Sequence, residues 1–171
     1  MALHVYLGHG ASGTAASMAA HVAGLRARGV VADAIDLPRR RAEDAVPALR
    51  AIVPAGPATV VGGQSYGGRV ASLAAAEPGT DYAALVLLSY PLHRPAEPAF
   101  EPRTAHWPSI PCPVLLLSGE ADPFARIDLL RAAVGRLAQA ELVTYPRLGH
   151  TLKPVLDDAL DRVAAFVKQL G

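Results

Sequence analysis

Residues 60–72, V-V-G-G-Q-S-Y-G-G-R-V-A-S, decide how this 171-residue chain is interpreted. An apolar run ends at two glycines, and Ser65 and Tyr66 then precede two further glycines. The pattern G-x-S-x-G at residues 63–67 is typical of a sharp turn from a strand into a helix. On such a turn the backbones at positions 63 and 67 approach closely, so both positions require glycine. We therefore predict that Ser65 occupies a strained bend, with its hydroxyl at the N-terminus of the following helix.

Length and charge indicate one globular domain over residues 1–171 and limit its partners. Sixteen basic and fifteen acidic residues give a formal net charge of +1, which argues against nucleic acid or an anionic membrane as a partner. The only basic cluster, residues 39–41, is interpreted as a solvated loop face. The N-terminus has no signal-peptide pattern and no apolar run reaches membrane-spanning length, so we expect a cytoplasmic protein. Abundant alanine and arginine are typical of GC-rich bacterial genomes.

Short apolar runs alternate with helical patterns along the chain. The runs are nearly continuous, which is typical of strands covered on both faces, as in a parallel sheet flanked by helices. We predict an α/β fold with an open, mostly parallel sheet of about six strands and no helical cap. The expected strands cover residues 3–7, 30–35, 59–61, 83–88, 114–117 and 142–145, and the expected helices cover residues 14–28, 42–52, 65–76, 127–137 and 154 to the end.

Residues 89–113 interrupt this alternation with a proline every few positions. Proline removes a backbone donor and disfavours helix interiors, so we predict a long loop without helix, which is either functional or disordered. His93 and His106 lie in this segment; lining a pocket is one interpretation of them, and the favoured one is that they are solvated loop residues. Cys112, the only cysteine, excludes a disulfide within the chain and is expected to be a buried thiol.

Three polar residues follow three different expected strands. A serine nucleophile needs a base, and the base needs an acid, which on this fold occur in the order serine, acid, histidine. Asp122 follows the fifth expected strand and His150 follows the sixth, while nearby Glu120 is a minor alternative as the acid. Taken singly, Asp122 is compatible with a turn former and His150 with an ordinary loop histidine. Because the carboxyl ends of parallel strands share one edge, their order favours a Ser65–His150–Asp122 triad.

An acyl-transfer site also needs donors for a developing oxyanion. The N–H of Tyr66, directly after the serine, is the first expected donor. The second is expected from the loop H-G-A-S-G at residues 9–13, where we favour Ala11, with Gly10 and Ser12 close by. His9 is expected to orient this loop rather than to titrate in catalysis.

Five short motifs carry a resemblance to a known family. They are H-G-A-S-G (9–13), G-G-Q-S-Y-G-G-R-V-A-S (62–72), S-Y-P-L-H-R-P (89–95), G-E-A-D-P-F (119–124) and G-H-T-L-K-P (149–154). With them the chain resembles the α/β-hydrolase fold, and more narrowly the small subfamily related to dienelactone hydrolases. That subfamily includes the testis-expressed hydrolase-like protein and the chromatin-associated NSL-complex subunit three. The resemblance implies Ser65 as nucleophile, Asp122 as acid and His150 as base.

The chain departs from this family in three respects. Its first strand corresponds to the third strand of a full α/β-hydrolase sheet, and residues 89–113 replace the usual helical cap. Dienelactone hydrolases proper use a cysteine nucleophile where this chain has Ser65. Without a lid we expect an accessible serine in a shallow pocket. The side chains expected near that pocket are Tyr66, Tyr90, Leu92, Trp107, Phe124 and Leu152.

These observations favour a soluble serine hydrolase that acts on small-molecule carboxylic esters or thioesters and needs neither a metal nor an organic cofactor. Two alternatives stay open. One is a non-catalytic binding or scaffold protein with the same fold, because a fold alone does not fix function. The other is an acyltransferase or peptidase that uses the same triad.

Overall fold

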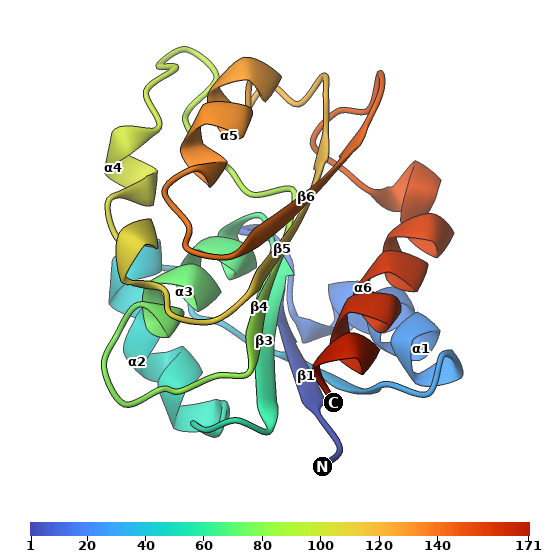
Figure 1. The fold of residues 1–171 in the computed structure, drawn as a ribbon. Coiled ribbons are helices and arrows are strands. Elements are labelled where there is room, and N and C mark those ends of the chain that lie inside the picture. Colours follow the sequence, from blue (N-terminus) through green and yellow to red (C-terminus); the bar gives the residue numbers. More distant parts are fainter.

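The computed structural model describes all 171 residues as an open sheet between two layers of helices (Figure 1). The sheet has six strands in the order β2-β1-β3-β4-β5-β6. This confirms the predicted sheet, and every neighbouring pair is parallel. The strands are β1 His4–Gly8, β2 Val31–Ile35, β3 Thr59–Gln64, β4 Ala84–Leu88, β5 Val114–Gly119 and β6 Ala140–Tyr145.

Helices cover both faces of the sheet. One hydrophobic layer joins the sheet to α2, α3 and α5, and a second layer joins it to α1 and α6, as Figure 1 shows for the two sides. No helix is long and apolar enough to cross a membrane. The α-helices are α1 Ala19–Ala27, α2 Ala42–Ile52, α3 Tyr66–Ala75, α4 Glu101–Thr104, α5 Ile127–Val134 and α6 Leu156–Leu170, and three 3₁₀ turns span Ala15–Met18, Trp107–Ser109 and Lys153–Val155.

Burial along the strands explains their continuous apolar sequences. Every residue of β4 and β5 is buried, because helices cover both faces of these central strands. The edge strand β6 is only partly covered, and none of its residues is fully buried. Apolar side chains on both faces of a strand are therefore retained where the sheet is enclosed on both sides.

Residues 89–113 contain short helical turns, so the prediction that this segment lacks helix was wrong. The α4 turn and the 3₁₀ turn Trp107–Ser109 each carry proline at the first or second position, where a missing N–H costs no helical hydrogen bond. The buried rings of Tyr90 and Trp107 pack edge to face with centroids 5.1 Å apart. Cys112 is buried as predicted, and burial raises the pKa of its thiol to about 11.

The bend between β3 and α3 has the predicted strain. Ser65 lies at φ 48° and ψ −114°, a left-handed region that non-glycine residues rarely adopt. A Cβ on Gly63 would lie 2.6 Å from the carbonyl carbon of Gly67 and 2.7 Å from the carbonyl oxygen of Gly8. A Cβ on Gly67 would collide with the Gly8 carbonyl group. The N–H of Gly67 also donates to the His9 carbonyl at 2.9 Å, so the bend rests directly on the end of β1.

We predict that Gly67→Ala lowers the free energy of unfolding by about 2 kcal/mol or more, because its Cβ would meet backbone that has no room to move. Gly149→Ala is the matched control, since a Cβ there meets nothing within 4 Å, and its effect should stay within about 0.5 kcal/mol. Urea unfolding followed by circular dichroism measures both values. Equal stability of the two variants would contradict this account of the bend.

Candidate active site

Three loops at one edge of the sheet bring Ser65, His150 and Asp122 together. Ser65 follows β3, Asp122 follows β5 and His150 follows β6. The Ser65 Oγ lies 2.8 Å from His150 Nε2, and His150 Nδ1 lies 2.7 Å from Asp122 Oδ2. Ser65 and His150 lie 85 positions apart and Asp122 and His150 lie 28 apart, yet the three side chains form one continuous line of hydrogen bonds.

The carboxylate of Asp122 has the surroundings of an orienting acid. Its side chain is fully buried, with 0% exposed, and its second oxygen accepts the N–H of Phe124 at 2.8 Å. Because the carboxylate accepts the Nδ1–H of His150, the Nε2 of that ring is left as an acceptor that faces the Ser65 hydroxyl. The ring of Phe124 packs on His150 with centroids 4.4 Å apart, which fixes the plane of the imidazole.

Glu120, the alternative acid, bonds to other partners. Its Oε1 accepts the hydroxyl of Thr144 at 2.7 Å and lies 3.6 Å from a guanidinium nitrogen of Arg131. No hydrogen bond or ion pair joins it to His150. The geometry therefore singles out Asp122 between the two candidate acids.

The acid loop and the histidine loop are joined through their backbones. The N–H of Glu120 donates to Tyr145 O and the N–H of Ala121 donates to Leu148 O, both at 2.9 Å. A Cβ on Gly119 would collide with the carbonyl oxygen of Leu148, so only glycine allows this contact. Sequence reasoning missed the role of Gly119, although its position at the end of an apolar strand was a usable signal.

The loop after β1 is held by His9, which is 2% exposed. His9 Nε2 accepts the N–H of Leu37 at 2.9 Å, so Nδ1 carries the proton and donates to Gly10 O at 2.7 Å. Gly13 N–H donates to the same carbonyl at 3.0 Å. In a trans peptide the N–H points opposite to the carbonyl, so the Ala11 N–H faces away from the His9 ring. The geometry agrees with an orienting role for His9.

The remaining predicted donors lie at exposed backbone or helix-end positions, and the predicted pocket side chains divide into partly exposed and buried ones. Tyr66 begins α3, where the first N–H groups have no acceptor inside the helix, and Ala11 and Ser12 are exposed in the loop after β1. Tyr66 and Phe124 are partly exposed beside the triad. The other four predicted pocket side chains are buried in the hydrophobic core, because they anchor residues 89–113 and the start of the last helix: Tyr90, Leu92, Trp107 and Leu152.

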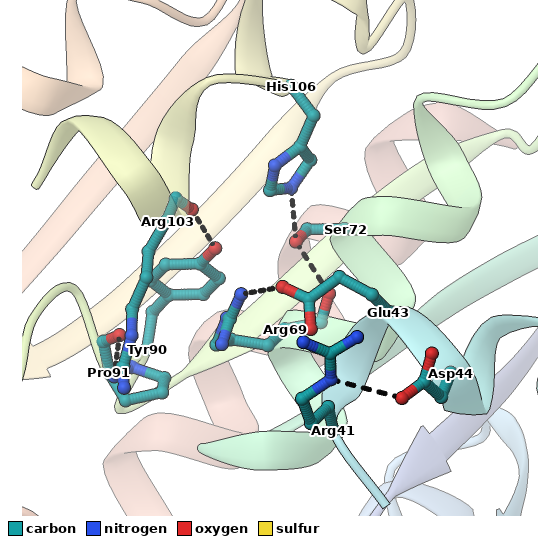
Figure 2. A network of polar contacts seen from close by, with 9 residues as sticks. All are labelled: Arg41, Glu43, Asp44, Arg69, Ser72, Tyr90, Pro91, Arg103 and His106. Atoms are coloured by element: carbon teal, nitrogen blue, oxygen red, sulfur yellow. Dashed lines mark hydrogen bonds and ion pairs between the residues drawn. The ribbon is translucent and has the colours of Figure 1, made fainter.

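A polar network beside the triad was not indicated by the sequence (Figure 2). Arg69 of α3 pairs with Glu43 of α2 at 2.8 Å. The Ser72 hydroxyl donates to Arg69 O, so His106 Nε2 must be the donor in its 2.8 Å contact with Ser72 Oγ. His106 was expected in a solvated loop, but it fastens residues 89–113 to α3, and burial lowers its pKa to about 4.

Ser72 and His106 do not repeat the arrangement of the triad. Ser72 is 0% exposed and its proton is engaged by a backbone carbonyl, so its oxygen is not available for attack. No group of three or more His, Cys, Asp or Glu side chains is placed to hold a metal ion. Ser65, His150 and Asp122 are therefore the arrangement in this chain with the geometry for nucleophilic chemistry.

Comparison with known proteins gives a consistent family assignment. The profile of the family described as "Alpha/beta hydrolase domain" matches residues 4–168. The structure is similar to a monoacylglycerol lipase from Paleococcus ferrophilus, with a TM-score of 0.83 and 15% identity over 98% of this chain and 95% of the other. No curated protein matches the sequence.

Two further solved structures share the fold. Est1E from Butyrivibrio proteoclasticus, with ferulic acid bound, gives a TM-score of 0.79 and 17% identity over 98% of this chain and 89% of the other. The thioesterase domain from the curacin biosynthetic pathway gives a TM-score of 0.75 and 15% identity over 97% and 90%.

The half-buried histidine at position 106 gives a pH prediction. Its pKa is about 4 in the folded protein against an ordinary value of 6.5, so the unfolded chain binds more protons between these values. The free energy of unfolding should therefore fall as the pH is lowered from 6.5 to 4. Comparing urea unfolding of the wild type with that of His106→Gln isolates this contribution, and the variant should lose less stability over that interval. An identical pH dependence in both proteins would show that His106 does not stay neutral.

Proposed function

This chain belongs to the alpha/beta hydrolase family, and we propose that it is a serine hydrolase that cleaves small-molecule carboxylic esters or thioesters. One observation carries the proposal: Ser65 Oγ lies 2.8 Å from the Nε2 of a histidine whose other nitrogen bonds a buried aspartate. Lipase, esterase and thioesterase structures among the fold neighbours support both substrate classes.

In the proposed reaction His150 acts as general base and then as general acid. It accepts the Ser65 proton at Nε2 while Oγ attacks the substrate carbonyl carbon and the carbonyl oxygen becomes an oxyanion. The buried carboxylate of Asp122 stabilises the imidazolium that forms. His150 then returns the proton to the departing alcohol or thiol as the carbon–oxygen or carbon–sulfur bond breaks, which leaves Ser65 acylated.

The proposed oxyanion site uses the backbone of the bend and of the loop after β1. Tyr66 N–H, at the N-terminus of α3, and Ala11 N–H are the proposed donors, with Gly10 and Ser12 beside the substrate. Fixed backbone donors and the helix dipole stabilise negative charge without reorganisation, and one such donor is worth about 3–4 kcal/mol. His9 holds the Gly10 carbonyl and so positions the second donor.

Hydrolysis of the acyl-enzyme completes the cycle. The side chain of His150 is 25% exposed, so the ring is partly open to solvent. His150 deprotonates a water molecule as it attacks the acyl carbonyl, and the proton returns to Ser65 Oγ when the carboxylic acid leaves. The absence of a helical cap domain supports direct access of water.

We predict that Ser65→Ala lowers kcat for a short-chain p-nitrophenyl ester by about 10⁴–10⁶-fold, because the attacking oxygen is lost. Circular dichroism should show an unchanged fold. A fluorophosphonate probe should label the wild type covalently and leave the variant unlabelled. If folded wild-type protein neither turned over esters or thioesters nor reacted with the probe, the scaffold alternative would stand instead.

A second pair of variants tests which carboxylate orients the base. Asp122→Asn replaces one carboxylate oxygen with an NH2 donor; with the amide oxygen on the Phe124 N–H, the NH2 faces His150 Nδ1 and favours the wrong tautomer, so kcat should fall by about 10⁴-fold. Glu120→Gln is the matched control, and kcat should stay unchanged because Glu120 bonds Thr144 rather than His150. Steady-state kinetics on one ester decides between them. Loss of activity in Glu120→Gln with activity retained in Asp122→Asn would reverse the assignment.

A further inference from the structure

A cavity of about 580 Å³ opens near the candidate triad. Tyr66 forms part of its lining, whereas Ser65 does not. The cavity is enclosed by the loop after β2, the first turns of α2 and α3, and residues 93–103. Five of its twelve lining residues are arginines, against two glutamates, Glu43 and Glu97. The arginines are Arg40, Arg41, Arg69, Arg94 and Arg103.

This positive charge is local, because the whole chain carries a formal net charge of only +1. Three of the arginines have an acidic partner within 4.0 Å. These ion pairs are Arg41–Asp44, Arg69–Glu43 and Arg94–Glu97. Arg40 and Arg103 have no such partner. The cavity therefore presents guanidinium groups whose charge the protein does not neutralise.

Arg69 and Arg103 are the most enclosed of these groups. Arg69 has 14% of its side chain exposed, and its buried Nε has no hydrogen-bond partner. The guanidinium of Arg103 donates to a backbone carbonyl, that of Pro91, at 2.9 Å. Burial, and then repulsion from Arg69, lower the pKa of Arg103 (Figure 2 shows the two side chains near one another). An anion in the cavity would relieve this repulsion and accept hydrogen bonds from the guanidinium groups that have no acidic partner.

Two residues of the cavity wall, Tyr66 and His93, are linked to the triad. Tyr66 follows Ser65 in the chain and forms part of the cavity wall, while its hydroxyl donates to Pro38 O at 2.6 Å. His93, on another wall, is 1% exposed, and its N–H donates to Phe124 O at 3.0 Å. The ring of Phe124 packs on His150. A group bound in the cavity would thus contact Tyr66, the neighbour of the serine, and His93, which is bonded to the residue that packs on the histidine.

We propose that this arginine-lined cavity binds an anionic group, a carboxylate or a phosphate, carried by the ester or thioester substrate. Arginine suits this role because its planar fork of donors matches both oxyanions in a bidentate fashion. The inference rests on the proposed function for the reaction at Ser65, and it adds the chemical class of substrate. The three-arginine region at residues 39–41, expected to be a solvated loop face, contributes Arg40 and Arg41 to the cavity.

Two matched substrate pairs test the proposal and separate the two anions. Mono-p-nitrophenyl adipate differs from p-nitrophenyl hexanoate in carrying a carboxylate in place of a methyl group. S-butyryl-4′-phosphopantetheine differs from S-butyryl-pantetheine in carrying a phosphate. In at least one pair kcat/KM for the anionic member should be about tenfold higher or more, mainly through a lower KM, and the advantage should shrink with added salt.

Three variants link this preference to the cavity. Arg103→Gln and Arg40→Gln should each reduce the anionic-to-neutral ratio of kcat/KM, by up to about tenfold for the more enclosed Arg103. Arg40 is exposed and unpaired, so its replacement tests the cavity even if Arg103→Gln fails to fold. Arg162→Gln is the charge-matched control in α6, on the opposite face of the sheet, and should keep the wild-type ratio.

Binding to Ser65→Ala protein separates failure of this inference from failure of the proposed function. Isothermal titration calorimetry with adipate and with 4′-phosphopantetheine should detect binding of at least one, weakened by Arg103→Gln or Arg40→Gln and not by Arg162→Gln. Turnover of neutral esters without any anionic preference, in the absence of such binding, would overturn the inference and leave the hydrolase intact. Binding without turnover of any substrate would support the anion site and overturn the reaction at Ser65.

Discussion

The site depends on one steric constraint, the close approach of the bend after β3 to the end of β1. Gly63 and Gly67 lie so near the Gly8 backbone that neither can carry a side chain. The same approach holds Ser65 at a positive φ, a conformation that costs about 1–3 kcal/mol and that the surrounding packing must offset. Because the Gly67 N–H bonds to His9 O, the contact also fixes the loop after β1 relative to Ser65.

Charge is divided between two neighbouring parts of the molecule. On the side of β5 and β6, a buried carboxylate at position 122 has both oxygens satisfied by a backbone N–H and an imidazole. On the side of α2 and α3, guanidinium groups line an open cavity with fewer carboxylates than cations. Tyr66 lies between these two regions, with its main chain at the bend and its hydroxyl bonded to the loop after β2. Burial raises the pKa of that hydroxyl, so it stays a donor.

The sequence predicted the features that depend on local pattern. Continuous apolar runs gave the six strands, and G-x-S-x-G gave both the bend and the strain at Ser65. Features that depend on distant contacts were missed. Pro102 indicated a loop, yet proline is compatible with the first turn of α4. Tyr90 follows the end of β4 and Trp107 precedes Pro108, so both were expected near the pocket, but they pack against each other in the core. The cavity joins arginines from positions 40 to 103, whose proximity only the fold creates.

The backbone hydrogen bonds between the acid loop and the histidine loop have a mechanical consequence. β6 is an edge strand with little burial, and such strands open locally at lower free energy than central strands do. Since Glu120 and Ala121 follow the buried central strand β5 and are bonded to Tyr145 and Leu148, they tie the histidine loop to the interior of the sheet. These bonds therefore keep the imidazole next to its carboxylate even where the edge strand itself opens.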